Sequence, residues 1–235
     1  MNVDHQHTGS QFAGRATAAA ERGDLAAAAA LSEDAAAAFL AEQGEPSFDA
    51  PNMLRVRADA LLGLGDHAEA ARTLDRADAL AAALPAGDPF DRLLVHLWRL
   101  RADALLTLGD HAAAAATLDR ADAFVPELPV GEPFDRLRVH LGRLRGLALL
   151  DGGDRPAARA VLTRALGHCE RTLGGEDLDA AALHNMLGIV GKFMGTFDDA
   201  ASHYARAIRR PRYGRRSRSA RGDPVRARPP RRSRA

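Results

Sequence analysis

Charged side chains that could bind a partner recur along this 235-residue chain at a constant spacing. Arg55, Arg99 and Arg143 are 44 residues apart, and Asp59 and Asp103 follow the first two arginines four residues later. A planar guanidinium binds a carboxylate through two parallel hydrogen bonds, so a row of arginines suits a partner that carries carboxylates. If these residues lie on helices, each Arg can instead pair with the Asp four residues on. The pattern therefore indicates either recognition of an acidic partner or internal ion pairs.

Residues that could carry catalysis or hold a metal are few. Cys169 is the only cysteine, which excludes a disulfide framework within the chain, and His168 beside it would point to another side of a helix. His5 and His7 make a poor metal site by themselves. Neither pair of adjacent glycines has the strand and the lysine of a phosphate-binding loop, the pairs being Gly152-Gly153 and Gly174-Gly175. We therefore expect no enzymatic activity, no metal and no cofactor.

Comparing the chain with itself reveals the elements that position the charged residues. The segment from Ala58 to Arg101 is repeated from Ala102 to Arg145, with 33 of 44 positions identical. A glycine followed by a turn residue marks five units, at Gly23-Asp24, Gly65-Asp66, Gly109-Asp110, Gly153-Asp154 and Gly195-Thr196. Apolar residues spaced as on one face of a helix precede and follow each glycine, which predicts a helical hairpin in each unit. The glycine can end the first helix in a left-handed conformation, and the Asp can cap the second.

Composition agrees with an all-helical chain. Hydrophobic residues make up 46% and charged residues 27%, as in folded proteins, and aromatic residues only 5%. Alanine, leucine and arginine dominate, and all three favour helices. We expect a flexible amino terminus at 1–9, a repeat domain at 10–208 and a disordered tail at 209–235. The units of the repeat domain are expected at about 10–47, 48–90, 91–134, 135–177 and 178–208.

The third unit carries a family resemblance. With Gly109 placed at position 15 of the unit, the other characteristic positions are Trp98 at 4, Ala102 at 8, Leu105 at 11, Ala114 at 20, Leu118 at 24, Ala121 at 27 and Pro126 at 32. This set resembles the tetratricopeptide repeat (TPR), although the spacing of 42 to 44 residues exceeds the usual 34. The longer repeats are similar to those of kinesin light chain, most closely from Arg171 to Ile208. The resemblance implies an all-α, right-handed α-solenoid of about five helical hairpins.

The resemblance also implies where a partner binds. In the family, the first helices of the hairpins line a concave channel, mainly through positions 2, 5, 9 and 12 of the repeat. Here the corresponding residues are His96 and His140 at position 2, Arg55, Arg99, Arg143 and Asn185 at position 5, and Asp59 and Asp103 at position 9. We expect these eight residues to hold a peptide or partner protein, which would make the chain a protein-protein interaction scaffold. A regulator that senses a signal peptide is the alternative, and internal Arg–Asp pairing of a solvated channel stays open.

The sequence departs from the family at two positions. Position 7, normally leucine, is Arg57, Arg101 and Arg145, and position 28, usually apolar, is Asp78 and Asp122. Because an unpaired buried charge is costly, these residues must reach solvent or pair with one another. We predict a ladder of Arg–Asp pairs between successive units.

The segment after Ile208 has a different composition. Its 27 residues contain 12 of the 32 basic residues and one acid, Asp223, so the preceding residues have 20 bases against 30 acids. Rich in Arg, Pro, Ser and Gly, the segment is predicted to be disordered. It could bind nucleic acid or another anionic surface, associate with the acidic repeats, or be the product of an out-of-frame reading of a GC-rich gene. The array ends there without a capping helix, which leaves an apolar side open to self-association.

The sequence gives no sign of a membrane segment. The amino terminus lacks a charged leader with an apolar core, and no stretch of about 18 uncharged apolar residues occurs. We expect a cytoplasmic protein without a membrane partner, and the single cysteine fits a reducing compartment.

Overall fold

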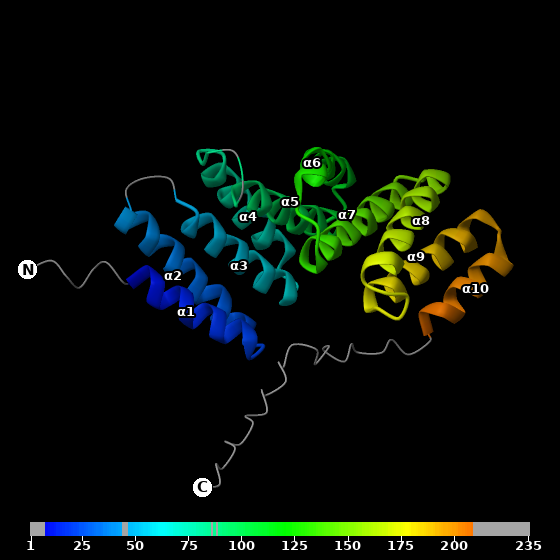
Figure 1. Ribbon diagram of the computed structural model, residues 1–235. Helices are drawn as coiled ribbons and strands as arrows, with labels where there is room; N and C mark the ends of the chain where they lie inside the picture. Colours follow the sequence, from blue (N-terminus) through cyan, green and yellow to red (C-terminus); the bar gives the residue numbers. More distant parts are fainter. Residues whose placement is uncertain (1–7, 44–46, 86, 88, 209–235) are drawn as a thin grey trace, which may run out of the picture.

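A computed structural model describes residues 8–43, 47–85, 87 and 89–208, and every regular element in these ranges is a helix (Figure 1). Five hairpins follow one another: α1 (Thr8–Glu21) with α2 (Leu25–Gln43), α3 (Asp49–Gly63) with α4 (His67–Ala81), α5 (Phe90–Thr107) with α6 (His111–Phe124), α7 (Glu132–Asp151) with α8 (Arg155–Thr172), and α9 (Leu178–Met194) with α10 (Phe197–Ile208). A short 3-10 helix, η1 (Val125–Glu127), follows α6. The predicted all-α solenoid is confirmed. The predicted tail at 209–235 lies outside the described residues.

The first helix starts slightly earlier than the expected beginning of the repeat domain. Thr8 and Gly9 belong to α1, and the Gly9 N–H donates to Glu42 Oε1 at 3.0 Å. Gly9 is buried against the ring of Phe39, which a Cβ at this position would meet at 2.7 Å. Contacts with α2 therefore hold these two residues in the array.

The turn inside each hairpin forms as its residues predict. The five turn glycines all adopt a left-handed conformation, with φ of 76° at Gly23, 82° at Gly65, 81° at Gly109, 84° at Gly153 and 76° at Gly195. In the second unit, the Asp66 side chain accepts the backbone N–H of Glu69 at 3.1 Å and so caps α4. The first, third and fourth units repeat this cap with Asp24, Asp110 and Asp154. The turns are thus fixed by local chemistry.

The hairpins stack side by side into a curved array, with α1 and α2 at one end and α10 at the other (Figure 1). Each second helix packs on the first helix of the next unit, and α3, α5, α7 and α9 also contact one another in series. Small residues allow close approach within each hairpin: Ala70 and Ala77 of α4 and Ala114 and Ala121 of α6 are fully buried. A continuous core therefore runs along the array.

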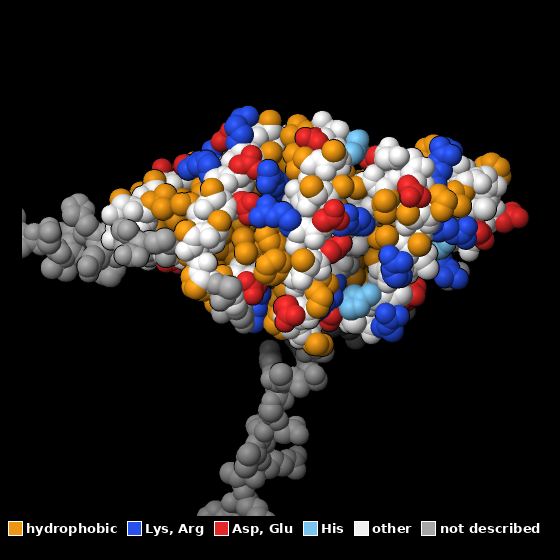
Figure 2. Space-filling view, turned by 90° about the horizontal axis from the view of Figure 1, so that it is seen from above, with side chains coloured by type: hydrophobic (Ala, Val, Ile, Leu, Met, Phe, Trp, Pro, Cys, Tyr) orange, Lys and Arg blue, Asp and Glu red, His pale blue; other side chains and the backbone are white. Residues whose placement is uncertain are grey.

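The predicted ladder of ion pairs between units is present. From α5, Arg101 places Nη2 at 2.6 Å from Asp75 Oδ1 and Nη1 at 3.9 Å from Asp78 Oδ2, both on α4. Arg145 of α7 repeats this one unit later, with Nη2 at 2.7 Å from both Asp119 and Asp122 of α6. Figure 2 shows acidic and basic side chains next to one another in the middle of the face seen from above. In the preceding unit, Arg57 pairs with a glutamate of α2, Glu33, at 3.1 Å.

Removing one cation of this ladder tests its contribution. We expect Arg101→Leu to lower the free energy of unfolding by about 1 kcal/mol, because Arg101 is only partly exposed and Asp78 keeps other partners. Urea denaturation measures the change. Arg72→Leu is the control, since Arg72 is 67% exposed and its one ion pair among the described residues is with Glu69 of its own helix. Unchanged or increased stability in Arg101→Leu would mean that the ladder does not stabilise the stack.

A single tryptophan fills the groove between the second helices of units two and three. Trp98 of α5 is 3% exposed, and its Nε1–H donates to Asp78 Oδ1 of α4 at 2.9 Å. From α6, Phe124 meets the indole edge to face with ring centroids 5.2 Å apart, and the Arg120 guanidinium lies over it at 4.6 Å. Arg120 also forms a bidentate pair with Asp78, at 2.9 and 3.2 Å. Trp98 thus joins two repeats through apolar, hydrogen-bonding and cation–π contacts.

Candidate peptide-binding channel

The first helices bring several of the predicted channel residues together. His96 of α5 is half-buried, and its pKa falls to about 4 because burial disfavours the charged imidazole and because Arg55, Arg99 and His140 lie close enough to repel it. These four residues come from three successive first helices, α3, α5 and α7. The expectation that positions 2 and 5 of neighbouring units face a common surface thus agrees with the electrostatics around His96.

Burial has the largest effect on the pKa values of two of the predicted channel arginines, Arg55 and Arg99. It lowers the pKa of Arg99, and the nearby carboxylates Asp59 and Asp103 only partly offset this effect. The same holds for Arg55, whose pKa is lowered by burial and partly restored by Asp59. A guanidinium stays protonated at any physiological pH. The lowered pKa values therefore mean that the nearby carboxylates do not fully offset the cost of burying these two positive charges.

The internal pairing differs from the one expected within each helix. Arg99 Nη2 lies 3.9 Å from Oδ1 of Asp59, which belongs to the preceding unit, rather than pairing with Asp103 four residues on. Arg55 directs its Nε to Asn52 Oδ1, at 3.0 Å. The reason is packing: a half-buried guanidinium reaches the nearest accessible acceptor, which lies on the neighbouring helix for Arg99 and on its own helix for Arg55. Within the described part of the chain, Arg143 makes no hydrogen bond or ion pair with another side chain.

His140 forms a hydrogen bond with a carboxylate of the next unit. Its Nε2 lies 3.0 Å from Asp179 Oδ1 at the start of α9, and Arg136 of α7 binds the same carboxylate. Burial alone would raise the pKa of Asp179, but the His140 hydrogen bond and Arg136 bring it below its usual value. Arg136 also binds Asp177, and hydrogen bonding to that carboxylate raises the Arg136 pKa.

Sequence reasoning did not find this group of Arg136, Asp177 and Asp179. The sequence carries one signal for it, since Arg136 and Asp179 repeat Arg92 and Asp135 at the 44-residue spacing. In the structure, Asp177 caps α9 by accepting the Asp179 N–H at 2.9 Å. Asn185, the predicted channel residue of α9, lies two turns further along that helix and is exposed. It is therefore accessible to a partner.

The depressed pKa of His96 predicts a pH dependence of stability. Its folded pKa of about 4 lies below the ordinary histidine value of about 6.5, so the unfolded chain binds the proton more tightly and stability falls as the pH drops from 6.5 toward 4. The wild-type free energy of unfolding should fall between pH 7 and pH 5. We expect this fall to be about 1–2 kcal/mol smaller in His96→Gln, allowing for the partial exposure of the ring. Urea denaturation of both proteins at the two pH values measures this difference. Parallel pH profiles would contradict this environment for His96.

The other candidate residues have different surroundings. Burial raises the pKa of Cys169, and the negative charges of Asp177 and Asp179 raise it further, to about 11. The thiol is therefore protonated near neutral pH. His168 points elsewhere, with Nε2 at 3.2 Å from Asp135 Oδ1. Among the described residues, no group of three His, Cys, Asp or Glu side chains is arranged to hold a metal ion, and His5 and His7 lie outside them.

None of the described helices is long and apolar enough to cross a membrane.

Comparison with known proteins extends the fold assignment. No family model and no curated protein matches the sequence. Among solved structures, the TPR-like repeats of a kinesin light chain from Podosopora anserina align over 86% of this chain and 94% of theirs, with 18% identity and a TM-score of 0.67. MamA from Desulfovibrio magneticus RS-1 aligns over 86% and 93%, with 16% identity and a TM-score of 0.61. The Rap conjugation gene regulator of plasmid pLS20, solved with the Phr* peptide, aligns over 83% of this chain and 50% of its own, with 14% identity and a TM-score of 0.62. The described helices therefore form a TPR-like α-solenoid.

Proposed function

We propose that this TPR-like solenoid is a protein-protein interaction scaffold that binds an extended, carboxylate-bearing segment of a partner in the channel lined by its first helices. The observation that carries the proposal is the row of Arg55, Arg99 and Arg143, one repeat apart on α3, α5 and α7. Catalysis is not part of the proposal.

The charge balance of the channel favours an acidic partner. Asp59 and Asp103 offset the three arginines in part, while His96 is neutral near pH 7 and adds no charge. Arg143 has no side-chain partner among the described residues, and burial outweighs the acids around Arg55 and Arg99. Carboxylates of a bound peptide would supply the missing partners through charge-assisted hydrogen bonds. Asn185, further along the array, offers an amide that can bond to a peptide backbone.

A selection from a random peptide library displayed on phage tests the proposal, with the full chain as bait. We expect the selected peptides to be enriched in Asp and Glu, and their affinity to fall as salt rises because exposed charges are screened. Enrichment of basic or uncharged peptides, or binding that ignores salt, would overturn it.

A peptide-sensing regulator is the second candidate, favoured by the similarity to the Rap regulator that was solved with a bound peptide. Such a protein would change the curvature of its array when a peptide binds, whereas a rigid scaffold would not. Small-angle scattering of the full chain with and without a selected peptide distinguishes the two: a shift in the radius of gyration favours the regulator. Nucleic-acid binding by the tail, self-association and a cytoplasmic location stay predictions.

A further inference from the structure

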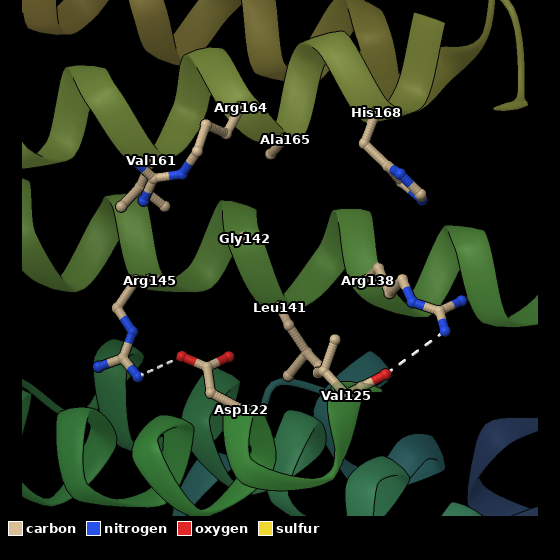
Figure 3. Close-up of a pocket in the computed structure, with 10 residues that line it drawn as sticks. All are labelled: Asp122, Val125, Arg138, Leu141, Gly142, Arg145, Val161, Arg164, Ala165 and His168. Carbon is tan, nitrogen blue, oxygen red and sulfur yellow. Dashed lines mark hydrogen bonds and ion pairs between the residues drawn. The ribbon is translucent and has the colours of Figure 1, made fainter. Parts of the chain in front are cut away.

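The second copy of the near-duplicated segment, from Ala102 to Arg145, reaches into the first helix of the fourth unit and contains one informative exchange. Gly142 of α7 occupies the position that Trp98 holds one unit earlier on α5. A cavity of about 340 Å³ lies beside Gly142, between α6, α7 and α8 (Figure 3). A comparable place between α4, α5 and α6 is filled by the Trp98 indole. The fourth unit therefore has a groove where the third has a tryptophan.

The side chains that hold the Trp98 indole have counterparts around this groove. Asp122 corresponds to Asp78, Arg164 to Arg120, Arg145 to Arg101 and His168 to Phe124, each 44 residues later, and all four later residues line the cavity. Figure 3 shows Asp122 on one wall, bound to Arg145, and Arg164 and His168 on α8 across the groove. The surroundings of an indole are thus repeated without the indole.

Exposure and pairing show that two of these counterparts, Asp122 and Arg164, have fewer contacts than Asp78 and Arg120 have in the preceding unit. The Asp122 side chain is 54% exposed, whereas that of Asp78, which accepts from Trp98 and Arg120, is 16% exposed. Arg120 pairs with Asp78, but Arg164 is exposed and makes no hydrogen bond or ion pair within the described part of the chain. An acceptor and a cation that serve Trp98 in one unit are therefore available in the next.

The missing ring cannot be supplied from position 142 without a shift of helices. A Cβ on Gly142 would lie 2.8 Å from the Cβ of Ala165 on α8, closer than side-chain carbons approach. Here α7 and α8 have closed on each other, while the groove toward α6 stays open. A ring that fills this groove in the present packing must come from outside the repeat.

The lining also disfavours a simple anion as the occupant. Arg138 donates to the backbone carbonyls of Val125 and Leu128, and Arg145 is engaged by Asp119 and Asp122. Only Arg164 is uncommitted among the lining arginines, and an anion beside it would face the Asp122 carboxylate. An aromatic ring with one N–H donor satisfies both groups.

We propose that this groove, formed by Asp122, Gly142, Arg164 and His168, binds a tryptophan side chain of a partner protein. The indole N–H donates to the Asp122 carboxylate, the Arg164 guanidinium covers the ring face, and His168 takes the place of Phe124 at its edge. The volume suffices, since a cavity of roughly 150 Å³ already accepts benzene. This surface is separate from the channel of the first helices and does not depend on the function proposed for that channel.

The test uses fluoroindole as the probe and fluorine NMR of the ligand as the readout, with the full chain. We expect the wild-type protein to broaden the fluorine line at millimolar probe, and excess N-acetyltryptophanamide to reverse the broadening. Asp122→Ala should weaken binding about tenfold, as should methylation of the indole nitrogen, because each removes the hydrogen bond to a charged acceptor. Asp119→Ala is the matched control: it also removes a 2.7 Å partner of Arg145 but does not line the cavity, so its affinity should stay within about twofold.

Three outcomes would overturn the proposal: no broadening with the wild-type protein, equal binding to wild-type and Asp122→Ala, or equal loss in Asp119→Ala and Asp122→Ala. Charge reversal at Arg99 and Arg143 should leave probe binding unchanged, which keeps failure of this site distinguishable from failure of the channel.

Discussion

Reversing two charges in the channel, with Arg99→Glu and Arg143→Glu together, is expected to abolish capture of the acidic peptides that the wild-type chain selects. The two residues lie one repeat apart on α5 and α7, and each would change from a donor for a carboxylate into a group that repels it. Losing one partner of a hydrogen-bonded charge pair in a binding site costs about 2–5 kcal/mol. Two reversals should therefore weaken binding by more than about a hundredfold, which fluorescence polarisation of a labelled peptide measures.

A control with the same change of net charge separates the channel from overall electrostatics. Arg72 of α4 and Arg159 of α8 lie on second helices and are 67% and 42% exposed. Their joint replacement by glutamate should reduce affinity by no more than a few-fold, through long-range effects that salt removes. Equal losses in both double variants would mean that net charge alone determines binding. Unaffected binding in the Arg99/Arg143 variant would exclude the channel as the site.

Replacing the buried tryptophan should have the largest effect on stability. We expect Trp98→Ala to lower the free energy of unfolding by about 3–5 kcal/mol, because it leaves a large cavity between α4 and α6 and removes the donor to Asp78. Urea denaturation followed by circular dichroism measures the change. Val130→Ala is the control for loss of apolar volume at an exposed site: Val130 is 93% exposed, so its change should stay within about 0.5 kcal/mol.

The comparison with Gly142 makes the Trp98 result more specific. In unit four, Gly142 has no side chain and Ala165 of α8 packs against it. The closer packing of α7 and α8 there takes the place of the contacts that a tryptophan makes in unit three. If α5 and α6 could close in the same way, Trp98→Ala would cost less than about 1 kcal/mol. That outcome would contradict the view that the indole joins units two and three.

The hairpins could be predicted from the sequence because their signals are local. Gly109 and Asp110 fix the turn between α5 and α6 through a left-handed φ and a side-chain cap, and neither needs a distant partner. Pairing between repeats could be predicted for Arg145 with Asp122, since the charges recur with the period of the units. The fold thus follows from punctuation and periodicity.

The details of the site could not be predicted in the same way because they depend on how neighbouring units pack. Arg99 pairs with Asp59 of the preceding first helix rather than with Asp103. His140 binds Asp179, 39 residues away, whereas Asp135, at the same spacing from His96, pairs with Arg138 and lies 3.2 Å from His168. The exchange of Trp98 for Gly142 is visible in the sequence. Whether α8 would close over the gap or leave a groove depends on the Ala165 contact, which only the structure gives.

The most direct test of peptide binding in the channel is site-specific photo-crosslinking with a selected acidic peptide. Benzoylphenylalanine is placed at Asn185, an exposed residue of the first helix α9, or at Ala116, an exposed residue of the second helix α6. Peptide binding in the channel predicts a crosslinked product from the Asn185 position, its loss in the Arg99→Glu/Arg143→Glu background, and none from Ala116. Crosslinking from Ala116 but not from Asn185 would contradict it.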